Sequence, residues 1–175
     1  MKPSSLRRFF NVWPAFLFTG IHVTAISHDW RQARVELRMR PWTKNYVGTH
    51  FGGSLFAMTD PFWMILVKEC LGNDYIVWDK AAEIEFVKPG KGTVHAEFRV
   101  TDELLDEIRA ATQSGEKYLH WCPADVIDAQ GDVVDIEAAA YRSSPLSRVL
   151  FARSTCAACQ RSADFHRQVV AMGKA

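Results

Sequence analysis

Cysteine is scarce in this chain, with four residues among 175. Cys70 and Cys122 stand far apart, while Cys156 and Cys159 form a single C-x-x-C. This uneven spacing is unlike the disulfide framework of a small secreted protein and favours a reducing, cytoplasmic compartment. His166 follows the C-x-x-C by seven residues, but no second pair accompanies it. We therefore expect neither a metal site nor a cofactor.

Charge of one sign is also lacking, because 21 lysines and arginines face 20 aspartates and glutamates. A net charge of +1 gives no electrostatic reason to bind nucleic acid. Beyond the N-terminal region the longest apolar run is Ser54–Val67, which contains Asp60 and Pro61 and is too short to span a bilayer. With 48% apolar and 23% charged residues, the composition excludes disorder and predicts a packed globule.

The N-terminal region has no small-residue cleavage site of the kind that ends a secretory signal. Met1–Arg8 is basic and Phe9–Ile26 is fairly apolar, which resembles a signal peptide loosely. Asn11, Trp13 and Pro14 interrupt the apolar run, however. We expect an amphipathic N-terminal helix packed on the domain, and export is the alternative.

Two strands and a long helix are indicated in the first half of the chain. Arg31–Arg40 alternates apolar and polar side chains, which is typical of an antiparallel strand with one face in water. Ile21–Ile26 predicts a strand that forms a hairpin with it. Ser54–Cys70 is apolar almost all round, so we expect a helix enclosed by the rest of the fold and ended by Gly72.

Four further strands and a short helix are expected in the second half. The strands cover residues 82–87, 94–100, 117–128 and 133–141, and the helix covers 102–112. Lys88–Gly92 predicts a hairpin loop between the first two strands. Pro123 indicates a bulge or an edge position. Residues 1–145 thus form one domain, and 146–175 form a C-terminal extension with a helix over 163–172.

The order of these elements has one simple solution. A curved antiparallel sheet wraps the single central helix and hides its apolar surface. This α+β plan is that of the hotdog fold.

The segment from Asn45 to Asp60 holds the residues that suggest chemistry. Two glycines at a helix start, Gly52 and Gly53, let a substrate oxygen approach unpaired backbone N–H groups, where the helix dipole favours negative charge. Such donors stabilise the oxyanion formed when a thioester is hydrolysed. The alternative is that the two glycines only permit close packing at a tight turn.

Asp60 is the one ionisable residue in the middle of the apolar helix. It follows Gly53 by seven residues, about two turns, and so projects on nearly the same side. A carboxylate on an enclosed helix is costly unless it is paired or functional. It would act as a general base on water or as a nucleophile. A carboxylate that bonds a loop, or a residue across a subunit interface, is the alternative.

This segment resembles the loop and helix start of hotdog acyl-CoA thioesterases of the phenylacetate-pathway (PaaI-like) type. Their pattern is an Asn, a His, two glycines and an Asp seven residues after the second glycine. The N-terminal stretches NVWPAF and GIHVTAIS resemble a subgroup with an extra N-terminal helix, and the layout agrees over residues 10–142. The resemblance implies a homodimer or a dimer of dimers, with the site between protomers.

The resemblance also implies that Asn45 and His50 position water or the thioester. His50 lies one residue further from the glycines than in the family, because Phe51 intervenes. A turn-forming Asn and a plain loop His are the alternatives. Lys88 and Lys91 would meet the phosphates of coenzyme A, or else belong to a solvated turn.

We therefore predict an acyl-CoA thioesterase-like hydrolase. Asp60 would be the base or nucleophile, and the Gly53 N–H would stabilise the oxyanion. Asn45 and His50 would position the reactants. Substrate binding would fall to Gly52, Lys88 and Lys91. The alternative is a non-catalytic hotdog protein that binds an acyl group or another apolar ligand.

Overall fold

The computed structural model describes residues 1–145 of the chain. The predicted extension, with its C-x-x-C pair and its helix over 163–172, lies outside the described residues. Helices and strands follow in the order α1 Pro3–Val12, α2 Pro14–Thr19, β1 Ile21–Ile26, β2 Gln32–Arg38, α3 Gly52–Leu71, β3 Tyr75–Phe86, β4 Thr93–Arg99, α4 Asp102–Ala111, β5 Tyr118–Ile127 and β6 Val133–Pro145.

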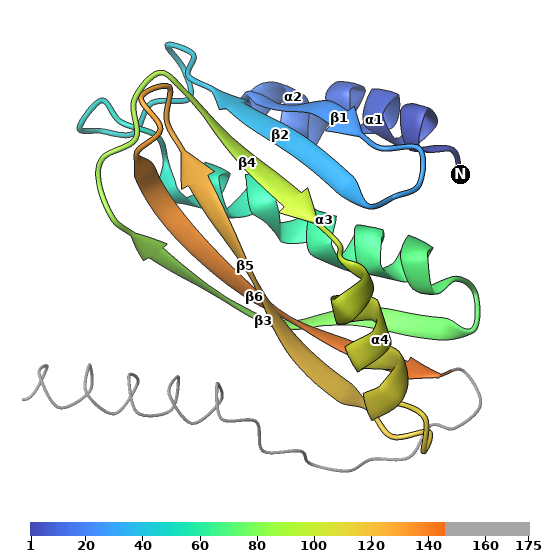
Figure 1. Ribbon diagram of the computed structural model, residues 1–175. Helices are drawn as coiled ribbons and strands as arrows, with labels where there is room; N and C mark the ends of the chain where they lie inside the picture. The colour runs from blue at the N-terminus through green and yellow to red at the C-terminus, as the bar shows by residue number, and fades with distance from the viewer. Residues whose placement is uncertain (146–175) are drawn as a thin grey trace, which may run out of the picture.

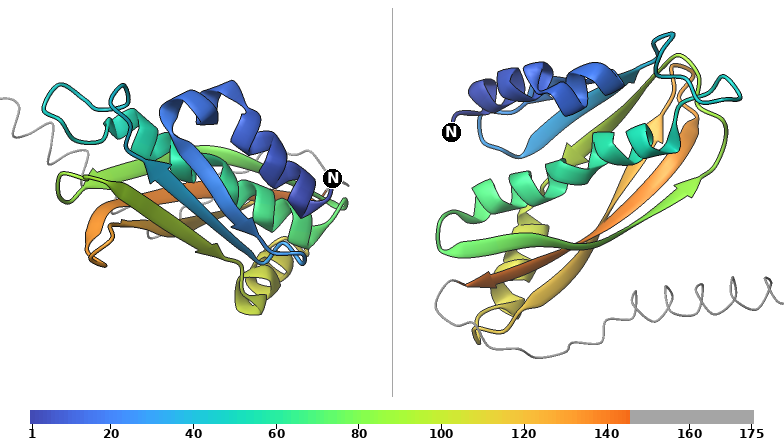
Figure 2. Two further views of the ribbon diagram at one scale, coloured as in Figure 1. Left: turned by 90° about the horizontal axis from the view of Figure 1, so that it is seen from above. Right: turned by 180° about the vertical axis from the view of Figure 1, so that it is seen from behind.

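The strands form one antiparallel sheet in the order β1-β2-β4-β5-β6-β3. The long helix α3 lies against one face of this sheet, and α1 and α2 lie beside β1 (Figures 1 and 2). The predicted arrangement of a curved sheet around one helix is confirmed. None of the helices within residues 1–145 is long and apolar enough to cross a bilayer.

The core lies between α3 and the inward face of the sheet. Alternate residues of β2 and β4, such as Val35 and Val94, are completely buried, as the period of two predicts. The rings of Phe62 and Trp63 on α3 pack on Phe98 of β4, with centroids 5.2 and 5.8 Å apart. These aromatic contacts fix α3 on the sheet.

The predicted N-terminal helix is present as two helices. Trp13 has extended backbone angles between α1 and α2, because a residue that precedes proline avoids the helical region. The break lets Phe10 and Phe16 both reach Phe62, with ring centroids 5.7 and 6.3 Å apart. The N-terminal helices therefore pack on the domain, as expected.

The two edges of the sheet differ. At β1, the side-chain amide of Asn11 on α1 takes the place of a neighbouring strand: its nitrogen donates to the Val23 carbonyl at 3.0 Å, and its oxygen accepts from the Val23 N–H at 2.8 Å. At the other edge, β3 pairs only with β6 in the described chain. One edge is thus covered by a helix and the other is open.

The predicted hairpin between the strands around residues 82–87 and 94–100 is wrong. β3 pairs with β6, whereas β4 lies between β2 and β5. The segment Lys88–Gly92 crosses between them over the end of β6, where the Val87 and Lys88 N–H groups donate to the Val134 carbonyl at 3.0 and 3.1 Å. The short connection is therefore anchored on a distant strand.

β3 begins earlier than predicted and contains a bulge. Asp79 pairs with Tyr141, and Ala81 pairs with Ala140, so Lys80 is an extra residue. Before the bulge, odd-numbered residues such as the buried Val77 face α3; after it, even-numbered residues such as Ile84 do. The sequence did not indicate the first half of β3, because the bulge interrupts the alternation of apolar and polar residues from which a strand is predicted.

The expectation that α3 is fully enclosed is wrong for a single chain. Leu55, Met58, Phe62 and Leu66 are buried, whereas Gly53, Asp60 and Glu69 are exposed. The reason is geometric, because the sheet of one chain covers only one side of the helix. The helix also runs through Pro61 without ending there.

Candidate functional site

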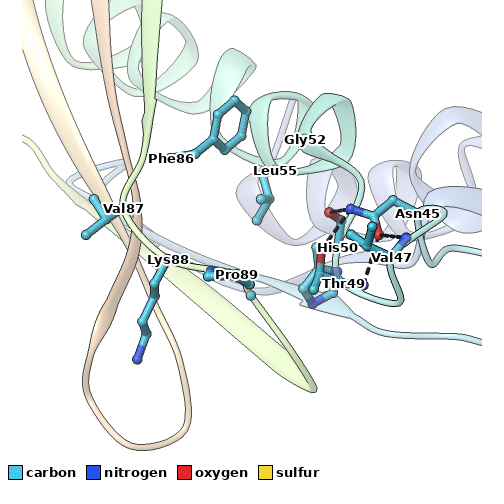
Figure 3. Close-up of a pocket in the computed structure, with 11 residues that line it drawn as sticks. Asn45, Val47, Thr49, His50, Gly52, Leu55, Phe86, Val87, Lys88 and Pro89 are labelled. Carbon is cyan, nitrogen blue, oxygen red and sulfur yellow. Dashed lines mark hydrogen bonds between the residues drawn. The ribbon is translucent and has the colours of Figure 1, made fainter.

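A cavity of about 440 Å³ opens at the N-terminus of α3 (Figure 3). It lies between the loop that precedes α3 and the crossing segment after β3. The walls combine polar loop residues with the apolar side chains of α3 and β3. They consist of Asn45, Val47, Thr49, His50, Gly52, Leu55, Phe86, Val87, Lys88, Pro89 and Gly90.

The first turn of α3 has unpaired donors. Phe51 is the N-cap and provides no side-chain cap, while its carbonyl accepts from the Ser54 and Leu55 N–H groups at 2.9 and 3.2 Å. Within residues 1–145, the N–H groups of Gly52 and Gly53 donate no hydrogen bond. The start of the helix therefore offers two donors to a substrate oxygen.

Both glycines lie close to aromatic rings. A Cβ at Gly52 would lie 2.7 Å from Cζ of Phe86, and a Cβ at Gly53 would lie 2.5 Å from Cε1 of Phe51. Both contacts are with ring atoms of side chains that are 58% exposed, so a side chain at either glycine would require the ring to shift. Close packing therefore explains the two glycines in part, and their role as donors to a substrate oxygen stays a prediction.

Asn45 organises the loop with its whole amide (Figure 3). The nitrogen donates to Thr49 Oγ1 at 2.8 Å and to the His50 carbonyl at 3.0 Å. The oxygen accepts from the N–H groups of Val47 and Thr49 at 3.1 and 3.0 Å. These bonds favour the turn-forming alternative, and contact with substrate stays a prediction.

His50 joins the loop to the crossing segment. It is 4% exposed, its N–H donates to the Gly90 carbonyl at 3.1 Å, and Nε2 lies 2.8 Å from the Gly92 carbonyl. Nε2 carries the hydrogen in that bond, because a carbonyl only accepts. Burial lowers the pKa of the ring. Nδ1 is buried and has no partner in the described chain, so it is left as an acceptor.

The two predicted lysines differ in their surroundings. Nζ of Lys88 lies 2.7 Å from both Asp128 and Asp132, at the turn between β5 and β6. Its side chain extends toward that turn (Figure 3), although Lys88 is among the residues that line the cavity. The two carboxylates, through these bonds, raise its pKa. Lys91 is exposed and does not line the cavity.

Asp60 lies outside the cavity wall, on the exposed side of α3 that also carries Gly53. The predicted spacing of two turns on one face is therefore present. Partial burial raises the pKa of its carboxyl. The predicted residues thus form two groups: Asn45, His50, Gly52 and Lys88 around the cavity, and Gly53 with Asp60 on the outer face of α3.

Sequence reasoning missed Asp79. It lies on β3 beside the bulge, on the face that packs against α3, and its Oδ1 is buried without a hydrogen-bond partner among the described residues. Burial, and next the charge of Asp60, raise its pKa to about 6. The one signal in the sequence is the shift of apolar residues from odd to even positions around Lys80.

The sequence profile of the family described as Domain of unknown function (DUF4442) matches residues 4–141. The chain belongs to this family. No curated protein matches its sequence.

Several solved structures share the architecture of this DUF4442 chain. A protein of unknown function and probable thioesterase from Pseudomonas aeruginosa is 20% identical, with a TM-score of 0.72 over 82% of this chain and 96% of that one. A thioesterase from Haemophilus influenzae is 12% identical, with a TM-score of 0.59 over 86% and 96%. The PaaI protein of the Escherichia coli phenylacetic acid degradation operon is 15% identical, with a TM-score of 0.55 over 85% and 95%.

These similarities confirm the predicted hotdog fold. At such identities they establish the architecture, while chemistry has to be argued from the residues of this chain.

Proposed function

We propose that the protein hydrolyses thioesters and that its substrates are acyl-CoAs. One observation supports this most: Gly53, whose backbone N–H is unpaired in the described residues, lies on the same helix face as Asp60, two turns further on. A hydrogen-bond donor for an oxyanion and a carboxylate base are the two parts that hydrolysis of an acyl compound needs.

In this mechanism Asp60 takes a proton from a water molecule as the water oxygen adds to the thioester carbon. The carbonyl oxygen becomes an oxyanion and accepts a hydrogen bond from the Gly53 N–H. The carbon–sulfur bond then breaks, and the thiolate takes up the proton. The products are a carboxylic acid and a free thiol. Direct attack by Asp60 on the carbon would use the same groups.

The cavity supports binding of an acyl group beside this centre. Leu55, Phe86 and Val87 provide apolar walls, and the Gly52 N–H lies at its rim as a second donor. We propose that His50, held by the crossing segment, presents Nδ1 as an acceptor to the substrate or a water. Lys91, at the surface, is the lysine available for coenzyme A phosphates, because Lys88 is held by two carboxylates.

We further propose that two copies pair through β3. Within residues 1–145 no strand pairs with the outer side of β3, and Ile76, Trp78, Phe86 and Val87 along this edge and just beyond it are 42–72% exposed. A second copy at β3 would also approach the exposed side of α3 and cover Asp60. The partner would thereby exclude water from a centre that a single chain leaves open.

The test is turnover of a panel of acyl-CoAs with detection of free thiol. In Asp60→Asn the shape is kept and the base is removed, so we expect kcat to fall by about 10²–10⁴-fold. Glu69→Gln is the matched control, because it removes an exposed carboxylate from the same helix. It should leave kcat within about twofold, in keeping with a surface change.

Two results would contradict the proposal. One is wild-type kcat in a well-folded Asp60→Asn protein. The other is acyl-CoA binding without release of thiol by the wild-type protein, which would favour the alternative of a non-catalytic acyl-binding protein.

A further inference from the structure

A line of exposed apolar side chains follows the two N-terminal helices. Phe9, Trp13 and Leu17 are spaced four residues apart, so each lies about one helical turn beyond the last. The rings of Phe9 and Trp13 stack with centroids 6.3 Å apart, and the Leu17 N–H donates to the Trp13 carbonyl at 2.9 Å. These three residues are 40–54% exposed, although Phe10 and Phe16 of the same helices are buried. The helices that pack on the core thus present a second apolar face to water.

The loop between β2 and α3 continues this face. Phe18 at the end of α2 and Trp42 of the loop line one cavity of about 210 Å³, and they are 69% and 71% exposed. Asn45 lines this cavity and also the cavity of the candidate site, so the two cavities are neighbours. We define the N-terminal surface as the exposed residues Phe9, Val12, Trp13, Leu17, Phe18 and Trp42.

The two segments that form this surface carry charge of one sign. Residues 1–28 and 37–59 contain no aspartate or glutamate. Their exposed basic residues are Lys2, Arg8, Arg40 and Lys44. None of these four forms an ion pair with a carboxylate among residues 1–145. The surface therefore combines exposed aromatic rings with positive charge that is not neutralised.

This charge indicates which partner fits the surface. In a symmetric contact with a second copy the same patch meets itself, which would bring its basic residues together without acidic partners. The proposed pairing through β3 leaves the surface uncovered, because α1 and α2 lie beside β1 at the opposite edge of the sheet (Figures 1 and 2). A bilayer with anionic lipids is complementary in both respects, since tryptophan and phenylalanine enter its interface and basic side chains are attracted to its phosphates.

We propose that the N-terminal surface docks the protein on an anionic phospholipid bilayer. The contact is peripheral: the aromatic rings enter the headgroup region, and the basic side chains lie among the phosphates. The cavity of the candidate site, which shares Asn45 with the cavity beside Trp42, is then held near the lipid–water boundary. An acyl-CoA with a long chain, which collects at that boundary, would reach the cavity from the membrane. This last consequence rests on the proposed function.

Flotation of the full chain with phospholipid vesicles tests the docking. The probes are vesicles of phosphatidylcholine alone and vesicles that contain about 30 mol% phosphatidylglycerol, whose headgroup is anionic. We expect binding to the anionic vesicles, and loss of most bound protein when the salt rises from about 0.1 M to about 0.5 M, because salt screens the basic residues. Failure to bind the anionic vesicles, or equal binding to both kinds, would overturn the inference.

Variants assign the contact to residues of the N-terminal surface and its rim. Lys44→Gln removes one positive charge and should weaken binding about fivefold, the contribution of one basic residue near an anionic membrane. The control Arg99→Gln removes an exposed arginine of β4 that alternates with the buried Phe98 and so points away from α3. It should change binding less than about twofold, and equal effects of the two variants would contradict the docking.

Trp42→Ser tests the apolar part of the contact. It should weaken binding about tenfold, because the exposed ring no longer enters the interface, and it should leave the Tm without lipid unchanged. Wild-type binding in a well-folded Trp42→Ser protein would overturn the assignment. A changed oligomer mass in Trp42→Ser, together with wild-type protein that does not bind vesicles, would assign the surface to a protein interface instead.

Kinetics on an acyl-CoA separate the docking from the proposed function, because flotation needs no substrate. Binding to anionic vesicles by a protein that releases no thiol would support the docking and contradict the hydrolase. Turnover by a protein that does not bind these vesicles would overturn the docking and leave the hydrolase.

Discussion

At the scale of single residues, His50 stands out because it connects two loops without carrying charge. Its main-chain N–H and its Nε2 both bond to the crossing segment after β3, and burial lowers its pKa from the ordinary value of 6.5. Below pH 6.5 the unfolded chain takes up a proton at this position before the folded protein does. Stability must therefore decline as the pH falls through this range.

We predict that this decline is absent in His50→Gln, whose amide nitrogen still reaches the Gly92 carbonyl but does not titrate. The contribution of His50 to the free energy of unfolding falls by at most about 1.4 kcal/mol per pH unit. The measurement is urea unfolding between pH 5 and about 7.5, with the exposed His28→Gln as control.

The difference between His50→Gln and the wild type is the informative quantity. Asp79 acts in the opposite direction, because its raised pKa means that the folded protein binds the proton first as the pH falls through about 6. Asp79 contributes equally to the free energy of unfolding of both proteins, so its effect cancels in the difference between them. Parallel stability curves for the two proteins would contradict the prediction.

The residues of the site were predictable as far as they depend on local geometry. Gly53 and Asp60 are seven residues apart on one helix, so the period of 3.6 fixes their relative direction. Asp79 was not predictable in this way, because its position relative to Asp60 depends on a bulge and on how β3 packs against α3. The roles of Lys88 and Asn45 also depend on partners that the local pattern does not reveal.

At the scale of elements, the start of α3 allows a test of its two donors. Phe51 has the extended conformation that a following proline requires, with ψ at 127°, and the Gly52 N–H donates no bond in residues 1–145. Proline at position 52 therefore fits the first turn of the helix. Gly52→Pro removes the backbone N–H donor at position 52. Gly52→Ala adds a comparable Cβ but keeps that N–H.

We predict that Gly52→Pro raises KM for an acyl-CoA about five- to tenfold over Gly52→Ala, the equivalent of one lost hydrogen bond of about 1–1.4 kcal/mol. The value of kcat should stay within about threefold, because the oxyanion is assigned to the Gly53 N–H. Steady-state kinetics of the two variants provide the comparison. A fall in kcat of about 10²-fold with KM unchanged would instead assign the oxyanion to Gly52.

The pairing of the strands shows where prediction from sequence failed. Apart from the first half of β3, strand positions followed from alternation, and the helix α3 followed from its apolar run and the glycine after it. The five-residue segment Lys88–Gly92 was read as a hairpin loop, because neighbouring strands joined by a short loop usually pair. The true partner of β3 is β6, about 50 to 70 residues away in the chain, and no local pattern indicates that contact.

At the scale of the whole molecule, the cover over β1 is expected to contribute to stability. Asn11→Leu removes two hydrogen bonds. The N–H and carbonyl of Val23, a residue whose side chain is completely buried, are then left unpaired. We predict a loss of about 2 kcal/mol, or a fall in Tm of about 4–8 °C. Differential scanning calorimetry measures it, with Ser4→Ala on the same helix as control. An unchanged Tm would show that water replaces the amide.

The open edge at β3 makes a second prediction at this scale. We expect a species of twice the chain mass of 19.9 kDa in sedimentation experiments at micromolar concentration. Activity per chain should fall on dilution below the dissociation constant, because in the proposed dimer a second copy covers Asp60. A stable monomer with full activity would contradict the proposed pairing.

The extra residue in β3 also affects which single-codon deletions in the gene the protein tolerates. An in-frame loss of the codon for Lys80 would restore an unbroken ladder, and either Val77 and Asp79 or the whole run from Ala81 to Phe86 would then turn to the opposite face. Loss of a codon for Lys91, an exposed residue of the crossing segment, would only shorten a connection. In a scan of single-codon deletions, loss of Lys80 should therefore be tolerated far less than loss of Lys91, which lies only eleven codons away.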